Sequence, residues 1–517
     1  MYLLAFDIGT SALKTAVLSV SGHVAASAGF AYPTRTDATG AAEQDPGLWW
    51  QGICLTARQL GESHPAIMRQ IAAIGVSGHM LGCLPLDSEG APVRPAMIHS
   101  DRRSVDACRQ IDQVVGKDVL YRLTGNVLDP RSSLCKVLWL KQNQPGQYAA
   151  TARFVQAKDY IVSKLTGCLD VTDYSDASHA QWIDISKKAY LQDVFTDLGI
   201  DGRKFPSLYR GTDVVGRTTD AAAAQTGLMQ GIPVVAGGGD GACANVAAGL
   251  VRPGEIYCSL GTTAWISRNV SRPLFDEKQR VFNIMSLDGE NCGVFGTMQN
   301  AGKAIEWALG AFGFPDPGAL DAAASGIAPG SEGLTFLPYL DGERTPVFDA
   351  NARGVFFNIG SMHQRAHFAR AVLEGTGYAL RSILDIFRDH AGGKGSDKIK
   401  DSDNSMDSDK IKDSDKINEM RLIGGGARSD LWCQILADIM AVRLRTLNIP
   451  AGDATSTGAA FAAGVGVGLY ASLADAAASV RADRLTEPHA CLQEIYDPGF
   501  ALYQKIYPHL QDLFHVS

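Results

Sequence analysis

The chain has 517 residues, 46% of them hydrophobic, and a formal net charge of −8. This length supports at least two domains, and the acidic balance argues against nucleic-acid binding, which usually needs a basic surface. The ten cysteines form no CxxC pair, so we predict free thiols and no zinc site.

Two segments bear on membranes and location. The uncharged stretch 454–474 is rich in Gly, Ala, Ser and Thr, which predicts a buried, closely packed helix and no membrane span. The first residues lack a basic start and a small-residue cleavage site, so we expect a first strand and no signal peptide. We therefore expect a cytoplasmic protein with no membrane or nucleic-acid partner.

The N-terminal residues predict a strand meander. Short apolar runs separated by turn residues indicate strands over 3–8, 14–20 and 23–30. Asp45 and Pro46 then supply an N-cap and a first-turn proline for a helix. The apolar run 71–77 ends at Gly78 and predicts a buried strand, so the chain is of the α/β class.

The second half repeats this opening. Residues 255–260 and 264–267 predict two strands joined by the turn 261–263, as the turn at Gly9 joins the first pair. Two such hairpins, almost half a chain apart, indicate a duplicated fold with paired domains. We place the boundary at the break Arg252-Pro253-Gly254, which gives domains 1–251 and 252–517.

A low-complexity segment interrupts the second half. The octapeptide Ser-Asp-Lys-Ile-Lys-Asp-Ser-Asp occurs at 396–403 and again at 408–415. Such a composition buries too little apolar surface to fold, so we predict a disordered surface insertion over about 395–418. It separates a predicted helix, 368–390, from a predicted strand, 420–423.

The first hairpin is a candidate phosphate loop. Gly9 lets the backbone approach a phosphate, and Thr10 and Ser11 offer hydroxyl and amide donors. Asp7 stands at the strand end, where it could hold Mg²⁺. A tight structural hairpin explains these residues equally well, but the second copy at 259–263 would let two hairpins enclose a triphosphate.

Two glycine runs follow predicted strands. Gly424 to Gly426 opens a helix and could receive a flat base or ribose, although a structural turn is the alternative. Gly237 to Gly241 carries Asp240 in a loop almost without side chains. That carboxylate could accept a proton from a substrate hydroxyl, or it could cap the following helix.

Together these elements resemble the FGGY carbohydrate kinases over residues 3–466, and within them most closely the xylulokinases. The most specific matches are 336–346, which reads Phe-Leu-Pro-Tyr-Leu-Asp-Gly-Glu-Arg-Thr-Pro, then 352–357, 370–375 and 458–460. The resemblance implies two ribonuclease-H-like domains, as in actin and Hsp70 ATPases, with the active site in the cleft between them. It also implies ATP and Mg²⁺ as cofactors and a small sugar as partner. Family members are often dimers or tetramers, and of these we expect a homodimer, although the sequence does not determine the oligomeric state.

The resemblance further implies roles for individual residues. Asp240 is similar to the general base, and Asp7 to the carboxylate associated with Mg²⁺. The other positions group by ligand: phosphate contacts at Thr10, Ser11, Lys14 and Thr262; nucleotide contacts at Gly302, Glu306, Gly426 and Asp430; sugar contacts at His79, Met80, Asp101 and Gly241. The implied reaction is ATP-dependent phosphorylation of a terminal hydroxyl, with D-xylulose giving D-xylulose 5-phosphate.

Departures from the family pattern concern the sugar. Xylulokinases typically have Gly-Gln-Met-His-Gly where this chain has Gly78-His79-Met80-Leu81-Gly82, and Asn where it has Gly241. Lost hydrogen-bonding groups weaken discrimination among hydroxylated substrates. Gluconate, another ketopentose or a polyol therefore remains an alternative acceptor.

Two other classes remain as alternatives. A chaperone-like or cytoskeletal ATPase would share the hairpins but would not need the cluster of His79, Met80, Asp101 and Asp240. A sensor would bind sugar without phosphorylating it, and the presence of both Asp7 and Asp240 argues against that class. ATP turnover with and without sugar separates the three.

Overall fold

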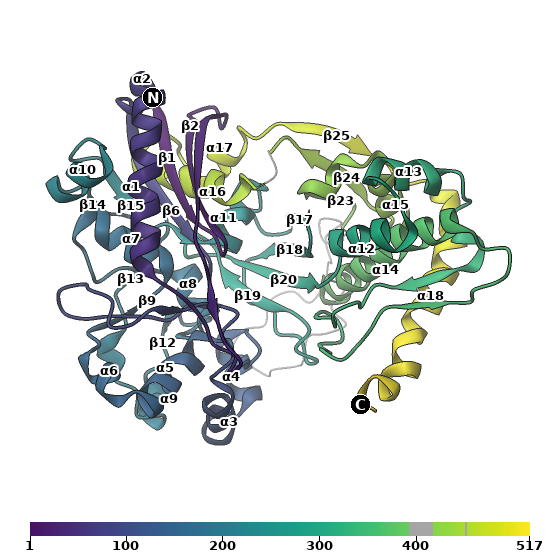
Figure 1. Ribbon diagram of the computed structural model, residues 1–517, viewed down its shortest axis with the longest axis horizontal. Coiled ribbons are helices and arrows are strands. Elements are labelled where there is room, and N and C mark those ends of the chain that lie inside the picture. The colour runs from purple at the N-terminus through teal and green to yellow at the C-terminus, as the bar shows by residue number, and fades with distance from the viewer. Residues whose placement is uncertain (392–416, 450–451, 517) are drawn as a thin grey trace, which may run out of the picture.

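A computed structural model describes residues 1–391, 417–449 and 452–516. Two seven-stranded sheets, one from each half of the chain, lie in two lobes (Figure 1). The predicted insertion falls outside the described residues, apart from its last two positions. Within the described ranges, no helix has the length and apolar character needed to span a lipid bilayer.

The first sheet has the strand order β14-β15-β6-β1-β2-β3, with β16 also paired to β6. Its strands are β1 (Tyr2–Ile8), β2 (Ala12–Ser19), β3 (Val24–Ala31), β6 (Ile71–Gly78), β14 (Val214–Arg217), β15 (Pro233–Val235) and β16 (Gly238–Gly239). β1 pairs antiparallel with β2 and parallel with β6. The predicted meander and buried strand are therefore confirmed.

The second sheet has the order β19-β20-β18-β17-β23-β24-β25. Its strands are β17 (Ile256–Leu260), β18 (Ala264–Val270), β19 (Phe282–Met285), β20 (Cys292–Met298), β23 (Glu419–Ile423), β24 (Arg443–Leu447) and β25 (Ala482–Thr486). β17 pairs antiparallel with β18 and parallel with β23, which repeats the pairing of β1. The predicted duplication of the fold is confirmed.

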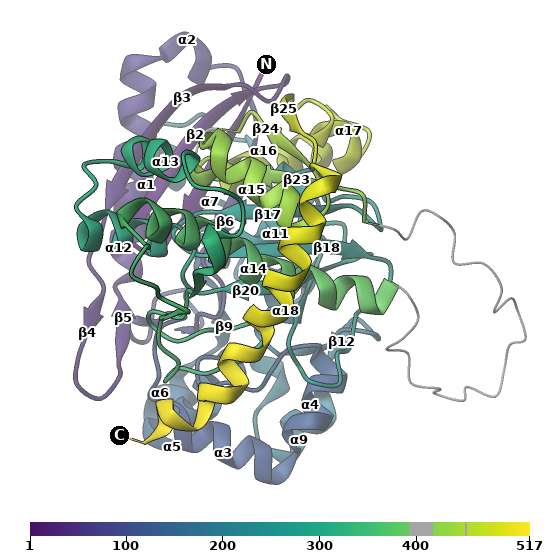
Figure 2. The ribbon, with the colours of Figure 1, turned by 90° about the vertical axis from the view of Figure 1, so that its right-hand side faces the viewer.

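Helices surround the sheets of both halves. The first half contributes α1 (Pro46–Ser63), α3 (Val105–Val114), α4 (Lys117–Thr124), α5 (Ser133–Asn143), α7 (Ala157–Thr166), α8 (Tyr174–His179), α10 (Asp220–Thr226) and α11 (Asp240–Ala247). Of these, α3, α4 and α5 belong to a hydrophobic core separate from that of the first sheet. The second contributes α12 (Gly302–Phe312), α13 (Pro317–Ser325), α14 (Arg365–Ala391), α15 (Asp430–Met440), α16 (Ala454–Gly466), α17 (Leu473–Ala477) and α18 (Gln493–Leu510). α18 runs across the outside of the second lobe toward the C-terminus (Figure 2). As predicted, Asp45 caps α1, where its side chain accepts a hydrogen bond from the Gly47 amide.

The helix α16 connects the two halves. It comes from the second half of the sequence but packs against β1, β6 and α11 of the first. Glycines permit this approach: a Cβ on Gly75 would lie 2.0 Å from the Ala459 carbonyl oxygen, and one on Gly458 would lie 1.9 Å from that of Cys243. The predicted buried, small-residue helix is thus confirmed, and it packs on the first sheet.

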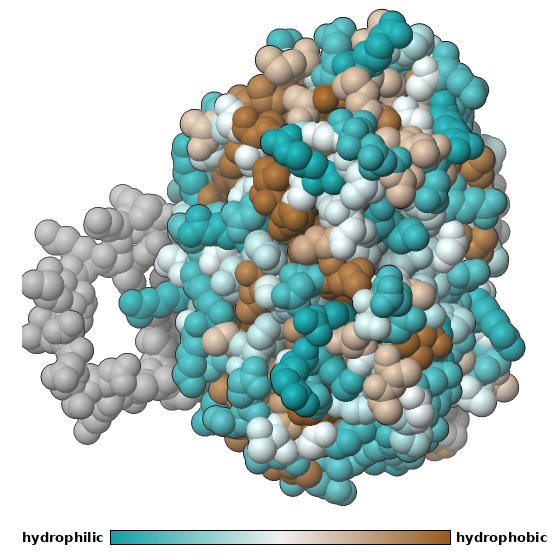
Figure 3. Space-filling model, turned by 90° about the vertical axis from the view of Figure 1, so that its left-hand side faces the viewer, coloured by the Kyte–Doolittle hydropathy of each residue, from teal (hydrophilic) through white to brown (hydrophobic). Residues whose placement is uncertain are grey.

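Within the described residues, the surface, the cysteines and the candidate metal clusters give no sign of a second site. Figure 3 shows a mixed hydrophilic and hydrophobic surface on the outer face of the first lobe. All ten cysteines are free thiols, as the sequence predicted. Within the described part of the chain, no cluster of three or more His, Cys, Asp or Glu side chains could hold a metal ion.

Candidate active site

The first hairpin is a tight turn between β1 and β2. The Gly9 amide donates to the Ala12 carbonyl at 3.1 Å, and a Cβ on Gly9 would lie 2.8 Å from that oxygen. Thr10 and Ser11 are exposed at the tip, so their hydroxyls and amides are open to a ligand. Such a turn offers donors to a phosphate without side chains that block its approach.

The second hairpin, between β17 and β18, is fixed to the start of α12. The Gly302 amide donates to the Gly261 carbonyl at 2.9 Å, and the Lys303 amide donates to the Thr262 carbonyl at 3.0 Å. A Cβ on Gly302 would lie 2.6 Å from the Gly261 oxygen, which explains a glycine here. This contact holds Thr262 at the edge of a large cavity.

That cavity has a volume of about 980 Å³. It is bounded by the second hairpin, α12, the start of α13, the glycine turn after β23, and the start of α16. Four predicted nucleotide or phosphate residues line it: Thr262, Gly302, Glu306 and Gly426. The volume suits a nucleotide-sized ligand.

Asp430 is not among the residues that line the cavity. Its exposed carboxylate forms an ion pair with Arg484 instead. The side chain of the preceding residue, Ser429, caps α15 by accepting from the Trp432 amide at 3.0 Å, and both Ser429 and Trp432 line the cavity. The predicted nucleotide contact at Asp430 thus lies one residue beyond the cavity wall.

Asp7 links the first hairpin to this cavity. Its Oδ2 accepts a hydrogen bond from Thr455, which lines the cavity. Its Oδ1 is buried and has no hydrogen-bond partner among the described residues. Burial raises the pKa of Asp7, while the Thr455 and Ser77 hydroxyls and the Lys14 charge lower it. A buried carboxylate oxygen without a partner is a fitting ligand for Mg²⁺, which usually takes one or two protein carboxylates together with substrate phosphates.

Lys14 faces Asp7 across the strand pair β1–β2. Its ammonium forms an ion pair with Asp453 and donates to the Gly452 carbonyl at 3.3 Å. Gly452 lines the cavity. Lys14 therefore stands beside the phosphate hairpin, with its charge already shared with the segment that leads into α16.

Asp240 is brought beside Asp7 by strand register. In the first sheet, both Asp7 and Gly238 lie opposite Ser77. The glycine run permits this, because a Cβ on Gly237 would lie 1.9 Å from the Val76 carbonyl oxygen. Asp240 is then the first residue of α11.

The electrostatics of Asp240 suit a base. Burial and the Asp7 charge raise the pKa of its carboxyl to about 7, although the Gly241 amide donates to its Oδ1 at 2.7 Å. The N-cap of α11 is Gly239, and no side chain caps this helix. Asp240 is thus not a conventional helix cap, and a base with such a pKa can accept a proton near neutral pH.

Three of the predicted sugar residues, His79, Met80 and Gly241, differ in how they pack around the loop that carries Asp240. Met80 packs against Gly239, where an added Cβ would lie 2.4 Å from the Met80 sulfur. His79 is buried, and neither ring nitrogen has a hydrogen-bond partner in the described part of the chain. Gly241 faces the second half, because a Cβ there would lie 3.2 Å from Ile284 Cδ1.

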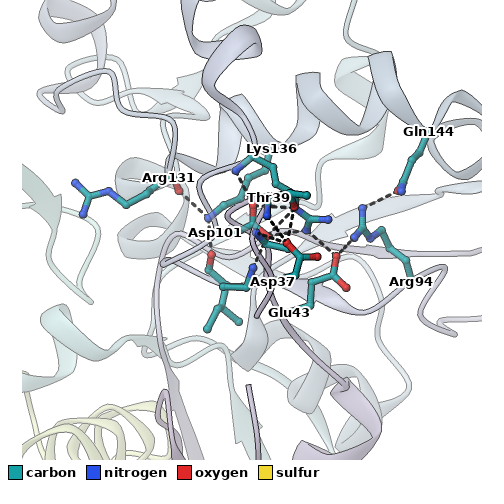
Figure 4. A network of polar contacts seen from close by, with 12 residues as sticks. Asp37, Thr39, Glu43, Arg94, Asp101, Arg131, Lys136 and Gln144 are labelled. Atoms are coloured by element: carbon teal, nitrogen blue, oxygen red, sulfur yellow. Dashed lines mark hydrogen bonds and ion pairs between the residues drawn. The ribbon is translucent and has the colours of Figure 1, made fainter. Parts of the chain in front are cut away.

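Asp101 is fully buried and already bonded. Its Oδ2 accepts from the Ala42 amide at 2.9 Å and from Arg103 Nη2 at 2.6 Å. Figure 4 shows Asp101 inside a polar network with Glu43, Arg94 and Lys136. The geometry gives Asp101 a supporting position behind the sugar loop, so a direct sugar contact stays a prediction.

Sequence reasoning missed several residues of this region. Ser77 and Thr455 lie in predicted elements that were given no role in the site, and the others lie outside the motifs: His99, Arg131 and Lys136. Lys136 donates to the carbonyls of Leu81 (2.5 Å), Ile98 (2.8 Å) and Arg131 (2.7 Å), and so holds the sugar loop. No signal in the sequence indicates this role, because the burial of Lys136 on α5 is visible only in the folded chain.

Two family models match the chain. They describe the N-terminal and C-terminal domains of the FGGY family of carbohydrate kinases, and they match residues 2–247 and 256–467. A xylulose kinase of Bacillus subtilis (strain 168) is 31% identical over 515 residues, which cover 99% of this chain and 98% of that protein.

Two solved structures from Lactobacillus acidophilus are similar to equal degrees. A ligand-bound xylulose kinase has a TM-score of 0.87 and 25% identity, covering 99% of this chain and 98% of its own. A gluconate kinase also has a TM-score of 0.87 and 25% identity, covering 98% of both chains. The fold is therefore equally similar to that of a xylulose kinase and that of a gluconate kinase.

Proposed function

Because the chain belongs to the FGGY family of carbohydrate kinases, we propose that it transfers the γ-phosphoryl group of ATP to a terminal hydroxyl of a short, open-chain sugar. The observation that carries this proposal is the pair Asp7 and Asp240, held side by side where the first hairpin meets the nucleotide-sized cavity. The relatives make D-xylulose the first acceptor to test and gluconate the second.

The proposed roles follow from position. Asp240 accepts the proton of the acceptor hydroxyl as that oxygen forms its bond to the γ-phosphorus and the bond to ADP breaks. Thr10, Ser11 and Thr262 donate hydrogen bonds to phosphate oxygens, and Lys14 adds a positive charge. Positioning and charge stabilisation supply most of the catalysis in phosphoryl transfer.

Asp7 is the proposed site of Mg²⁺. Its buried Oδ1 has no hydrogen-bond partner in the described residues, and its charge raises the pKa of Asp240. A cation bound there would give Oδ1 a partner and would weaken the repulsion between the two carboxylates. Bound Mg²⁺ would neutralise phosphate charge, which is its usual contribution in kinases. Thr455 would keep Asp7 oriented through its hydrogen bond.

The second half is proposed to hold the nucleotide. Gly302, Glu306 and Gly426 line the cavity, and the glycine turn after β23 leaves room for the base or ribose. Closing the two halves over both ligands would exclude water and so suppress hydrolysis of ATP.

ADP release measured with and without acceptors tests the proposal. The panel contains D-xylulose, other ketoses, polyols, glycerol and gluconate. We expect ADP formation that depends on an acceptor. ADP formation that no acceptor stimulates would indicate an ATPase, and acceptor binding without turnover would indicate a sensor.

A further inference from the structure

A buried lysine lies beside the sugar loop, residues 79–82. Lys158 belongs to α7, and its side chain is fully buried. Its backbone approaches the last residue of β6, because a Cβ on Gly78 would lie 3.1 Å from the Lys158 amide nitrogen. In the pairing of β6 with β16, Gly78 lies opposite Gly239, the residue before Asp240. Lys158 is therefore adjacent to the strand end where the sugar loop begins and the turn of the base is attached.

The ammonium group of Lys158 binds three buried carboxylates. It forms ion pairs with Asp159, with Asp173 at 3.0 Å and with Asp176 at 3.5 Å. Asp159 follows it in α7, while Asp173 is the N-cap of α8 and Asp176 lies in the first turn of that helix. Burial lowers the pKa of Lys158, but the carboxylates raise it well above its ordinary value, so the lysine is charged. This ammonium thus ties α7 to the start of α8 inside the protein.

One side of this cluster leads to the proposed base. Asp173 Oδ2 accepts hydrogen bonds from the amide (2.8 Å) and the hydroxyl (2.5 Å) of Ser175. The same hydroxyl accepts a hydrogen bond from the Gly239 amide at 3.0 Å. Gly239 is the N-cap of α11, and Asp240 is the first residue of that helix. Lys158 therefore holds the turn that carries Asp240 through an unbroken series of side-chain contacts.

The other side of the cluster leads to the sugar loop. Asp159 Oδ2 accepts a hydrogen bond from the Gln156 amide at 2.9 Å. The Gln156 side chain in turn accepts from the Gly82 amide, also at 2.9 Å. The Ser133 hydroxyl lies 3.3 Å from Gln156 Nε2 and donates to the Gly82 carbonyl at 2.7 Å. Both backbone polar groups of Gly82, the last residue of the loop, are therefore held.

Stability alone explains this cluster poorly. A buried ion pair gains little over apolar side chains of the same volume, because removing charges from water is costly. Three carboxylates share one ammonium, and neither oxygen of Asp176 has a hydrogen-bond partner among the described residues. What the cluster does provide is a connection between two backbone segments, at Gly82 and at Gly239, that are far apart in the sequence.

We propose that Lys158 is a positioning residue of the transfer reaction. Its link through Ser175 holds the turn of Asp240, and its link through Gln156 holds the sugar loop. An acceptor hydroxyl bound at the loop then lies where the carboxylate can take its proton. Because the two links end on different segments, they control different steps: alignment of the base for transfer, and binding of the acceptor. The inference rests on the proposed kinase function and adds the residue that aligns its parts.

Ser175→Ala tests the link to the base. It removes the acceptor of the Gly239 amide, so we expect kcat to fall by about 10- to 100-fold, since a small displacement of a catalytic group costs that much. KM for the acceptor should stay nearly unchanged. Ser178→Ala is the matched control, because Ser178 is also fully buried on α8 and its hydroxyl accepts from an amide of β19, that of Met285, at 3.0 Å. Both variants should melt earlier than the wild type, and only Ser175→Ala should lose kcat.

Gln156→Met tests the link to the sugar loop. It removes the acceptor of the Gly82 amide at nearly constant side-chain volume, so KM for the acceptor should rise about tenfold while kcat stays nearly unchanged. Lys158→Met removes the shared anchor and should show both effects. If Lys158→Met does not fold, the separate effects of Ser175→Ala on kcat and of Gln156→Met on KM decide the question.

The outcomes separate this inference from the kinase proposal. Equal kcat values in Ser175→Ala and Ser178→Ala, or wild-type constants in a folded Lys158→Met, would overturn the positioning role and leave the kinase proposal standing. If the wild type phosphorylates no acceptor, the kinase proposal fails and amide hydrogen exchange tests the links by themselves. Faster exchange at Gly239 in Ser175→Ala and at Gly82 in Gln156→Met would support them, and unchanged exchange would overturn them.

Discussion

At the scale of single residues, Asp240 shows how position decides between two roles. A carboxylate in the first turn of a helix usually stabilises that helix. Here the N-cap is Gly239, and the neighbouring charge of Asp7 makes ionisation of Asp240 unfavourable. A position that is electrostatically costly for the free protein is typical of a functional residue.

Replacing this carboxylate should abolish turnover. We predict that Asp240→Asn lowers kcat by about 100- to 10,000-fold, because the general base is lost, while ATP still binds. Asp220→Asn is the control, because Asp220 is also the first residue of a helix, α10, but is exposed. Steady-state kinetics with ATP-binding calorimetry measure both variants, and near-normal turnover of Asp240→Asn would exclude the base.

The pKa of Asp240 also predicts a pH dependence of activity. A base must be ionised, and the pKa of this group is raised to about 7. We expect kcat/KM to fall about tenfold per pH unit below that value, and a cation at Asp7 to move the midpoint to lower pH. A profile that stays flat from pH 8 to pH 5 would contradict this expectation.

The same pKa has a consequence for stability. The pKa of Asp240 is higher in the folded protein than its ordinary value of 3.8, so folding favours the protonated carboxyl. The contribution of this carboxyl to the free energy of unfolding is therefore fully present below about pH 4 and is lost as pH rises through about 7. The loss at pH 8 is at most about 4 kcal/mol, at about 1.4 kcal/mol per pKa unit. Asp240→Asn removes it, so the unliganded variant should melt higher than the wild type at pH 8 and equally at pH 4. Calorimetry at both pH values checks this, and a lower melting temperature at pH 8 would contradict it.

At the scale of secondary-structure elements, α16 and β6 fix the position of Asp7. β6 carries Ser77 beside Asp7, and α16 carries Thr455, which binds Asp7. Their backbones approach closely only because residue 75 has no side chain. The distance between these two elements therefore sets the position of the proposed cation ligand.

We predict that Gly75→Ala destabilises the protein by about 1–3 kcal/mol, because the new Cβ would overlap the Ala459 carbonyl and force the elements apart. It should also lower activity. The control is Gly61→Ala in α1, where a new Cβ meets nothing within 4 Å. That change should stabilise the protein by about 0.5–1 kcal/mol through helix propensity, and denaturant unfolding measures both. Equal effects of the two substitutions would contradict the packing account.

At the scale of the whole molecule, local patterns in the sequence predicted the duplicated sheets well. Apolar runs on either side of Gly9 and Gly261 indicate the strands of the two hairpins, and the apolar run 71–77 indicates the buried strand β6. The return of α16 to the first sheet was not predictable, because nothing in its small-residue composition says which sheet it covers. Tertiary contacts alone bring Thr455 to Asp7.

The candidate site was predictable where glycine motifs mark it, and less so at the substrate. Asp7 and Asp240 stand at the ends of recognisable strands, so their meeting follows from strand order. In the sequence, Leu81 and Gly241 indicate fewer hydrogen-bonding groups at the acceptor than xylulokinases have. The structure adds His99, whose ring lies 6.3 Å from that of His79, from a loop that carries no local signal.

The most direct test of the central claim is the identity of the product. The protein is incubated with ATP, Mg²⁺ and the acceptor panel, and the phosphorus and proton resonances of the mixture are followed by NMR. The account predicts ADP and one sugar phosphomonoester in equal amounts, with the phosphorus coupled to the protons of a terminal CH₂ group. Inorganic phosphate in place of the ester, or a phosphate on a secondary carbon, would contradict it.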